Sequence, residues 1–82
     1  MRLPHDLPDD DLVTLLWHYG YAPDRESGSH RRLTSTLGEA QHHLTVPRHA
    51  PLRVGTLSAI VTDVAAFLDR DRVEFSEDLF GR

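Results

Sequence analysis

Hydrophobic residues near the N-terminus repeat with helical spacing. Leu12, Leu15, Leu16 and Tyr19 fall at i, i+3, i+4 and i+7, a pattern that predicts an amphipathic helix over about 9–19. Three aspartates at 9–11 stand at its start, where carboxylates cap free N–H groups and suit the helix dipole. Gly20 follows as a suitable residue beyond the C-terminus. We therefore interpret the acidic triplet as a helix-start signal and not as a metal site.

From Ser29 to Val46 the pattern changes to alternation, which indicates a β-hairpin. Gly38-Glu39 suits a two-residue type II′ turn at its centre. Pairing outward from that turn places Leu37 opposite Ala40, Leu33 opposite Leu44, Arg31 opposite Val46 and His30 opposite Pro47. The other face then carries only polar side chains, those of His30, Arg32, Thr34, Thr36, Gln41, His43 and Thr45. This separation of apolar and polar residues supports the register.

Two further segments complete the predicted fold. Residues 21–27 can add a third strand, and Pro23 favours an edge position for it. From about Thr56 a second helix is predicted, with Leu57, Ile60, Val61, Val64 and Leu68 on one stripe. Ser76 is expected to cap one last short turn before Gly81. The order predicts an α+β, two-layer sandwich with the helices on one face of a small antiparallel sheet and the other face open.

Length and composition narrow the class of protein. At 82 residues the chain is expected to form one domain over 1–82, and 39% hydrophobic with 27% charged residues is typical of a soluble globular protein. No apolar run approaches the roughly 20 residues that span a bilayer, and the N-terminus has no signal-peptide pattern, so we expect a cytoplasmic protein without membrane contact. The absence of cysteine excludes disulfides, thiolate catalysis and cysteine-based zinc sites.

Charge is segregated along the chain. The net charge is −4, but between Arg25 and Arg53 five arginines face two glutamates, and four of the six histidines lie in the same segment. A basic centre between acidic ends is compatible with phosphate binding, although the acidic total argues against it. The histidines do not suggest a metal, because His42 and His43 point to opposite faces of a strand and no His-x3-His pair lies on a helix. We expect neither a metal nor a cofactor.

Four short motifs carry a family resemblance. With "GY" at 20–21, "SGSH" at 27–30, "LTVPRH" at 44–49 and "GTLSAI" at 55–60, the chain resembles the HicA family of bacterial toxins, which are small mRNA interferases. The resemblance implies an α-β-β-β-α fold like the double-stranded-RNA-binding domain. It also implies a metal-independent endoribonuclease whose catalytic histidine follows the Gly-Ser step, here His30. A HicB-type antitoxin that blocks the toxin's site is implied as partner, with operator DNA reached only through that antitoxin.

The chemistry of RNA cleavage suggests roles for residues around this histidine. RNA supplies its own nucleophile, the 2′-hydroxyl, and an imidazole ordinarily titrates near neutral pH, so His30 can act as general acid or base. Gly28 would let the RNA backbone approach, and Ser29 would offer a hydroxyl or N–H. The side chains expected to hold phosphate are Arg32 and Arg48, with Arg31 and Arg25 behind them.

Several alternatives remain open from sequence alone. His43 is either a second proton carrier in contact with RNA or a solvated strand residue. His49 either caps the loop before the second helix or takes part in function. Trp17 either stacks on a base or packs on the edge of the first helix. The function of the chain also has an alternative to the ribonuclease, namely a non-catalytic RNA-binding or antitoxin-binding module of the same fold. The acidic charge favours this module, and the intact Gly-Ser-His disfavours it.

Overall fold

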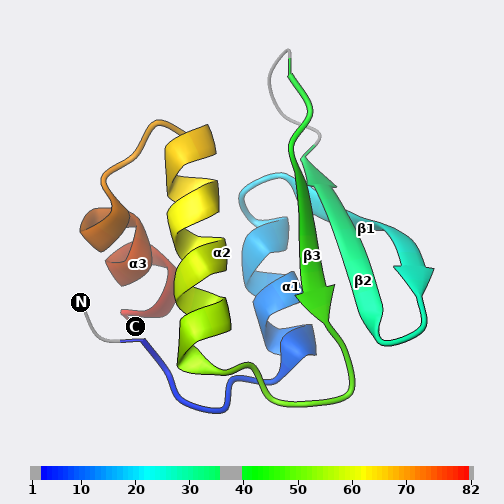
Figure 1. Ribbon diagram of the computed structural model, residues 1–82. Coiled ribbons are helices and arrows are strands. Elements are labelled where there is room, and N and C mark those ends of the chain that lie inside the picture. The colour runs from blue at the N-terminus through cyan, green and yellow to red at the C-terminus, as the bar shows by residue number, and fades with distance from the viewer. Residues whose placement is uncertain (1–2, 36–39, 82) are drawn as a thin grey trace. The chain divides into compact units, whose positions relative to one another are not determined.

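The computed structural model describes residues 3–35 and 40–81. The elements follow in the order α1 (Asp9–Trp17), β1 (Tyr21–Ser27), β2 (His30–Ser35), β3 (His43–Pro47), α2 (Val54–Phe67) and α3 (Arg72–Phe80) (Figure 1). The predicted α+β class and the predicted order of a helix, three antiparallel strands and a helix are confirmed, and a further helix follows. The chain divides into two compact units, Leu7–Pro51 and Met1–Asp6 with Leu52–Arg82.

The first unit contains α1 and an antiparallel sheet with the strand order β1-β2-β3. The predicted register is confirmed, with Leu33 opposite Leu44, Arg31 opposite Val46 and His30 opposite Pro47. The third strand predicted at 21–27 forms at the sheet edge and includes Pro23. The predicted turn at Gly38-Glu39, and with it the pairs next to that turn, lies outside the described residues.

Helix α1 packs against β1 and lies over one face of this sheet (Figure 1). Its predicted stripe is buried at Leu12 and Leu16. The helix ends at Trp17, two residues earlier than predicted, because Tyr19 and Gly20 donate short-range hydrogen bonds to Leu16 and Trp17 and Gly20 adopts a φ of +91°. The predicted capping by the aspartates is wrong, since Pro8 takes the N-cap position and its carbonyl accepts the N–H of residues 11 and 12.

The core of this unit consists of side chains from α1 and from the sheet face turned toward it. Tyr21, Leu33 and Val46 are fully buried. The hydroxyl of Tyr21 lies 2.7 Å from Nδ1 of His42, so the polar end of this buried ring has a partner. These contacts hold the strands in one register and leave their alternate residues on the opposite face.

The second unit contains α2 and α3. The stripe predicted on α2 is buried at Leu57, Ile60, Val61 and Val64, and the helix begins at Val54 rather than at Thr56. Arg72 of α3 donates to the hydroxyl oxygens of Thr62 and Ser58 on α2 and so links the two helices. Among the described residues, no helix has the length and apolar character needed to cross a membrane.

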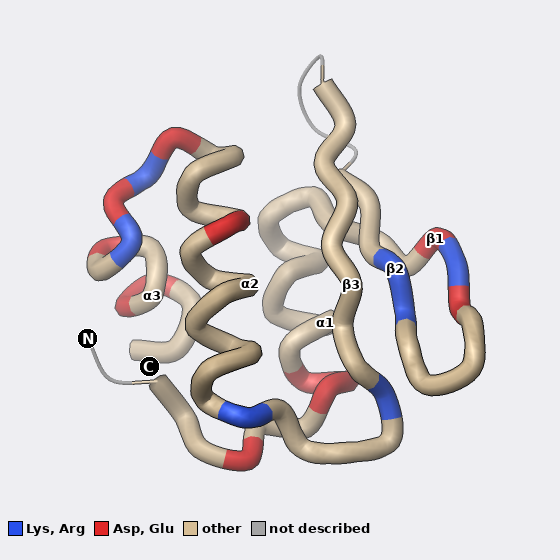
Figure 2. Tube along the Cα trace, in the orientation of Figure 1, with Lys and Arg blue, Asp and Glu red and all other residues tan. Residues whose placement is uncertain are grey.

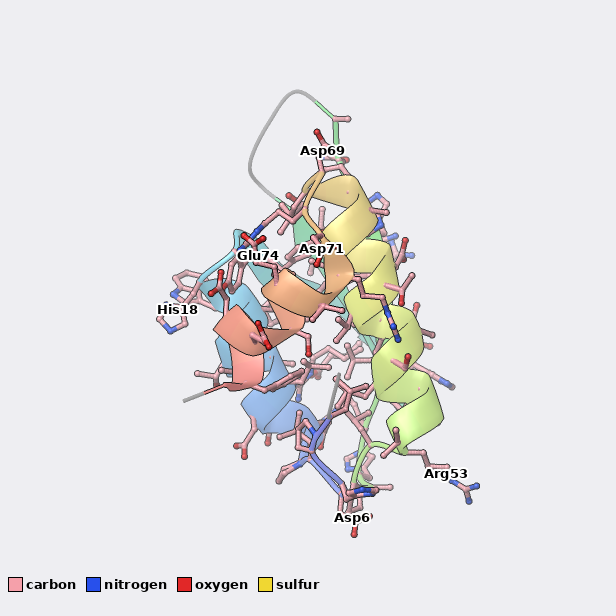
Figure 3. All side chains as sticks on the ribbon, turned by 90° about the vertical axis from the view of Figure 1, so that its left-hand side faces the viewer. Asp6, His18, Arg53, Asp69, Asp71 and Glu74 are labelled. Atoms are coloured by element: carbon pink, nitrogen blue, oxygen red, sulfur yellow. The ribbon has the colours of Figure 1, made fainter. Side chains whose placement is uncertain are left out.

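The start of α3 corrects the prediction for the C-terminal segment. The expected cap at Ser76 is wrong, because that residue is buried inside a longer helix, Arg72–Phe80. Asp71 is the N-cap, and its carboxylate accepts the backbone N–H of Glu74 at 3.0 Å. Figure 3 shows Asp69 and Asp71 at the connection from α2, with Glu74 in the first turn of α3.

Candidate active site

His30 stands at the first position of β2, directly after the tight turn from β1. Gly28 in that turn has a φ of +58°, a left-handed conformation that favours glycine, and no atom lies within 4 Å of where a Cβ would stand. The carbonyl of Ser29 accepts the backbone N–H of Arg48 at 2.7 Å, which ties the turn to the end of β3. His30 itself is exposed, and its Nδ1 is 3.5 Å from Oγ of Ser29, at the limit of a hydrogen bond. The imidazole is therefore accessible at a defined place on the sheet.

Strand pairing decides which predicted residues share a face with His30. Residues directly opposite one another project to the same side of a sheet, and alternate residues of one strand do so too. We call the side away from α1 the open face; it carries Arg25, Ser27, His30, Arg32, Thr34, His43 and Thr45. Arg31 projects to the other side. Arg25, Arg32 and His43 are therefore the predicted binding residues that accompany His30.

On the side of α1, the two remaining arginines share one carboxylate. Arg31 pairs with Asp10 of α1 and with Glu26 of β1, each at 3.0 Å, and only 13% of its side chain is exposed. Arg48 reaches the second oxygen of Glu26 at 3.3 Å. The hydrogen bond to Asp10, followed by that to Glu26, raises the pKa of Arg31 despite its burial. Arg31 and Arg48 thus join α1, β1 and the end of β3, and they do not lie on the open face.

A bulge in β1 lies at Asp24, whose carboxylate contacts residues of the open face. Pro23 is opposite Leu33 and Arg25 is opposite Arg32, so Asp24 is the extra residue between them. Its carboxylate accepts from Arg32 at 2.9 and 3.1 Å and from the hydroxyl of Thr34. The bond from Thr34 first, and that from Arg32 second, lower the pKa of Asp24 below its usual 3.8, so it is ionised at neutral pH.

His43 joins the same cluster from β3. Its Nδ1 lies 2.8 Å from Oγ1 of Thr34, and the ring is otherwise exposed. Sequence reasoning missed Asp24 and Thr34 as site residues. The interruption of a strand by Pro23-Asp24 is the signal that could have indicated a bulge at this position.

Most of the positive charge in this region is already matched by nearby carboxylates. Figure 2 shows acidic and basic residues interleaved along β1, beside the basic residues of β2. Among the described residues, Arg25 makes no ion pair, and the buried Nε atoms of Arg32 and Arg48 have no hydrogen-bond partner. Within the part of the chain that the structure describes, the open face therefore keeps one guanidinium without a carboxylate partner, that of Arg25, whereas Arg32 is paired with Asp24 and its unpaired Nε is buried.

The other candidates take less defined positions. His49 is exposed, with a φ of +73°, in the segment after β3. Trp17 is 63% exposed at the end of α1, so the prediction that it packs on the helix edge has little support from burial. Within residues 3–35 and 40–81, no group of three or more histidine and acidic side chains is arranged to hold a metal ion.

Comparison with known proteins identifies the family. The model of a family described as HicA toxin of bacterial toxin-antitoxin matches residues 10–65, which is more than half of the chain and includes nearly all of α1, the whole sheet and most of α2. No curated protein and no solved structure matches the chain. A toxin of such a system implies an antitoxin as its partner. The family match, together with the α+β fold, shows that this chain belongs to the HicA toxin family.

Proposed function

We propose that this toxin is a metal-independent endoribonuclease that cleaves mRNA, with His30 as general acid or base. The observation that carries the proposal is the placement of His30, exposed on an open sheet face beside Arg25 and Arg32 and within the segment that matches the toxin family. Cleavage through the 2′-hydroxyl needs one group to move a proton and others to stabilise charge on the phosphate. An accessible imidazole next to guanidinium groups meets both needs.

The surrounding residues support a binding mode for one strand of RNA. Arg25 and Arg32 lie opposite each other on the open face and are the first candidates to hold phosphate. Gly28 and Ser29 form the turn over which the RNA backbone would approach His30, with the Ser29 hydroxyl as an additional donor. Arg31 and Arg48 can reach phosphate only by leaving Glu26, so their main contribution is to hold the ends of β1, β2 and β3 in place.

A HicB-type antitoxin is the proposed partner. It would cover the open face and so exclude RNA from His30, and operator DNA would be reached only through it. The protein would act on RNA in the cytoplasm.

One observation favours the second candidate, a non-catalytic module that binds RNA or the antitoxin. Three of the four predicted phosphate ligands are paired with carboxylates, and the chain as a whole has a charge of −4. Both features weaken the attraction for RNA. The two candidates differ in whether the isolated protein cuts RNA.

The test compares the native chain with His30→Ala and with His18→Ala in induced cells and with purified RNA. His18 is a matched control because it is another exposed histidine, and its side chain points outward from the end of α1 (Figure 3). We expect the native protein and His18→Ala to stop growth and cleave RNA, and His30→Ala to fold normally but cleave about 10²- to 10⁴-fold more slowly. A native protein that is harmless at high level would support the non-catalytic module. A folded His30→Ala protein that cleaves at the native rate would remove His30 from the mechanism.

A further inference from the structure

A chain of hydrogen bonds crosses the open face from one edge strand to the other. It runs from Asp24 in the bulge of β1 to the hydroxyl of Thr34 on β2 and on to Nδ1 of His43 on β3. Arg32 adds two contacts to the carboxylate of Asp24 from the neighbouring position of β2. All three strands therefore contribute to one polar cluster.

The hydrogen bonds from Asp24 to Thr34 and His43 determine which ring nitrogen of His43 carries a proton. An ionised carboxylate only accepts hydrogen bonds, and a threonine hydroxyl has a single proton to donate. Thr34 must therefore donate to Asp24, and toward His43 it can only accept. Nδ1 of His43 must then carry a proton, which leaves the lone pair of the neutral ring on Nε2. That nitrogen belongs to an exposed side chain and is not engaged by this chain of bonds.

The position of this cluster separates it from His30. Thr34 lies four residues beyond His30 on β2. The two sets of directly opposite residues that contain them, here called rungs, are therefore about 13 Å apart at the usual rise per strand residue. His43 is on the rung of Thr34, whereas His30 is on the rung of Pro47. Because the ring of His43 is held against Thr34, it is poorly placed to act on a phosphodiester bond at His30. The structure thus disfavours His43 as the second proton carrier for a bond cut at His30.

We propose that His43 is instead an RNA-contact residue that reads a nucleotide flanking the cleaved bond, with Asp24 and Thr34 as the residues that position it. This rests on the proposed ribonuclease function and deepens it. Nε2 of His43 would accept a hydrogen bond from the RNA, either from an N–H of a base or from the 2′-hydroxyl of the ribose. Arg32, held next to Thr34 by Asp24, would bind the phosphate of the same nucleotide.

The first experiment needs no RNA. Imidazole nitrogen shifts of the native protein, measured by NMR at a pH where His43 is neutral, report which nitrogen carries the proton. We expect the Nδ1–H tautomer in the native protein and in Thr34→Ser, which keeps the hydroxyl. In Thr34→Val, which keeps the shape but removes the hydroxyl, we expect the proton to redistribute toward Nε2. An Nε2–H tautomer in the native protein would overturn the inferred arrangement.

The second experiment measures binding of the His30→Ala protein to a set of short RNAs altered at one nucleotide at a time. Adding His43→Phe should weaken binding between about two- and tenfold, the usual value of one exposed hydrogen bond, for RNAs with the preferred donor, and should leave the others unchanged. Thr34→Val should reduce the same preference, and Thr34→Ser should restore it. If a single 2′-deoxy substitution abolishes the effect, the donor is the ribose hydroxyl; if only base changes do so, it is the base.

Two outcomes would overturn the proposal, for different reasons. If His43→Phe weakens binding to every RNA equally, or to none, while binding itself persists, His43 does not read a nucleotide. If neither the native protein nor His30→Ala binds RNA at all, the ribonuclease function fails and the contact fails with it. The tautomer measurement then still decides whether the chain of hydrogen bonds exists.

Discussion

Arg25 offers the sharpest test of the proposed binding of RNA by this acidic protein. It is exposed on the open face, opposite Arg32, and makes no ion pair with another described residue. Arg32 shares its charge with Asp24. If these two arginines each neutralise one phosphate, counterion release gives a slope of about −1.4 in a plot of log K against log salt for single-stranded RNA, at about −0.7 for each contact. Arg25→Ala should halve that slope.

The size of the effect is large enough to measure directly. A tenfold rise in salt should weaken binding of the parent protein about 25-fold and that of Arg25→Ala only about fivefold. Fluorescence anisotropy with a labelled RNA, in the His30→Ala background to prevent cleavage, gives both slopes.

Arg53→Ala is the matched control, because it removes the same charge from an exposed arginine before α2 (Figure 3). A change in net charge alone would lower affinity in both variants alike. Arg25 is not a phosphate contact if Arg25→Ala keeps the full slope, or if Arg53→Ala loses as much of it.

Two other predictions follow from the carboxylates near the site. Glu26→Gln removes the carboxylate shared by Arg31 and Arg48. Because Glu26 is half exposed, urea unfolding should show a loss of at most about 1 kcal/mol in the free energy of unfolding. The affinity for RNA should rise, because the charge of both guanidiniums is no longer matched. Unchanged affinity would mean that neither arginine faces the RNA. Asp24 has a folded-state pKa below 3.8, so its stabilising effect is present above that pH and is lost as the pH falls through the lower value. The difference in unfolding free energy between the native protein and Asp24→Asn should therefore shrink in urea titrations below about pH 3.8, and a constant difference would contradict this.

The register of β2 and β3 could be predicted because burial and alternation agree there. Leu33, Leu44 and Val46 must all lie on the core side, and a shift by one residue would expose all three. Helix α3 was predicted only as a short turn from Ser76, because most of its residues are polar and its apolar stripe is short, with Phe75 and Leu79 four residues apart. Asp71 followed by Glu74 three residues later is the helix-start signal that could have found it.

The position of His30 could be predicted in the same way, since it depends only on the register of the hairpin. The ion-pair partners of the arginines could not be predicted from the sequence. Arg31 pairs with Asp10, which is far away in sequence. Arg32 pairs with Asp24, whose side-chain direction depends on the bulge in β1. A count of charge along the chain therefore overstated the positive potential of the basic centre, because it did not show which cations had carboxylate neighbours.

The bulge at Asp24 decides the electrostatics of the candidate site. If β1 continued regularly from the pairing of Pro23 with Leu33, Arg25 would stand opposite Arg31 on the side of α1, and Glu26 would stand opposite His30 on the open face. The extra residue reverses this, placing Arg25 opposite Arg32 and Ser27 opposite His30. One inserted residue thus exchanges a carboxylate opposite the candidate catalytic histidine for a hydroxyl, and places the cation of Arg25 on the same face, two residue pairs away. Because RNA carries a negative charge on every phosphate, this exchange favours the proposed binding of RNA at His30 despite the acidic net charge of the chain.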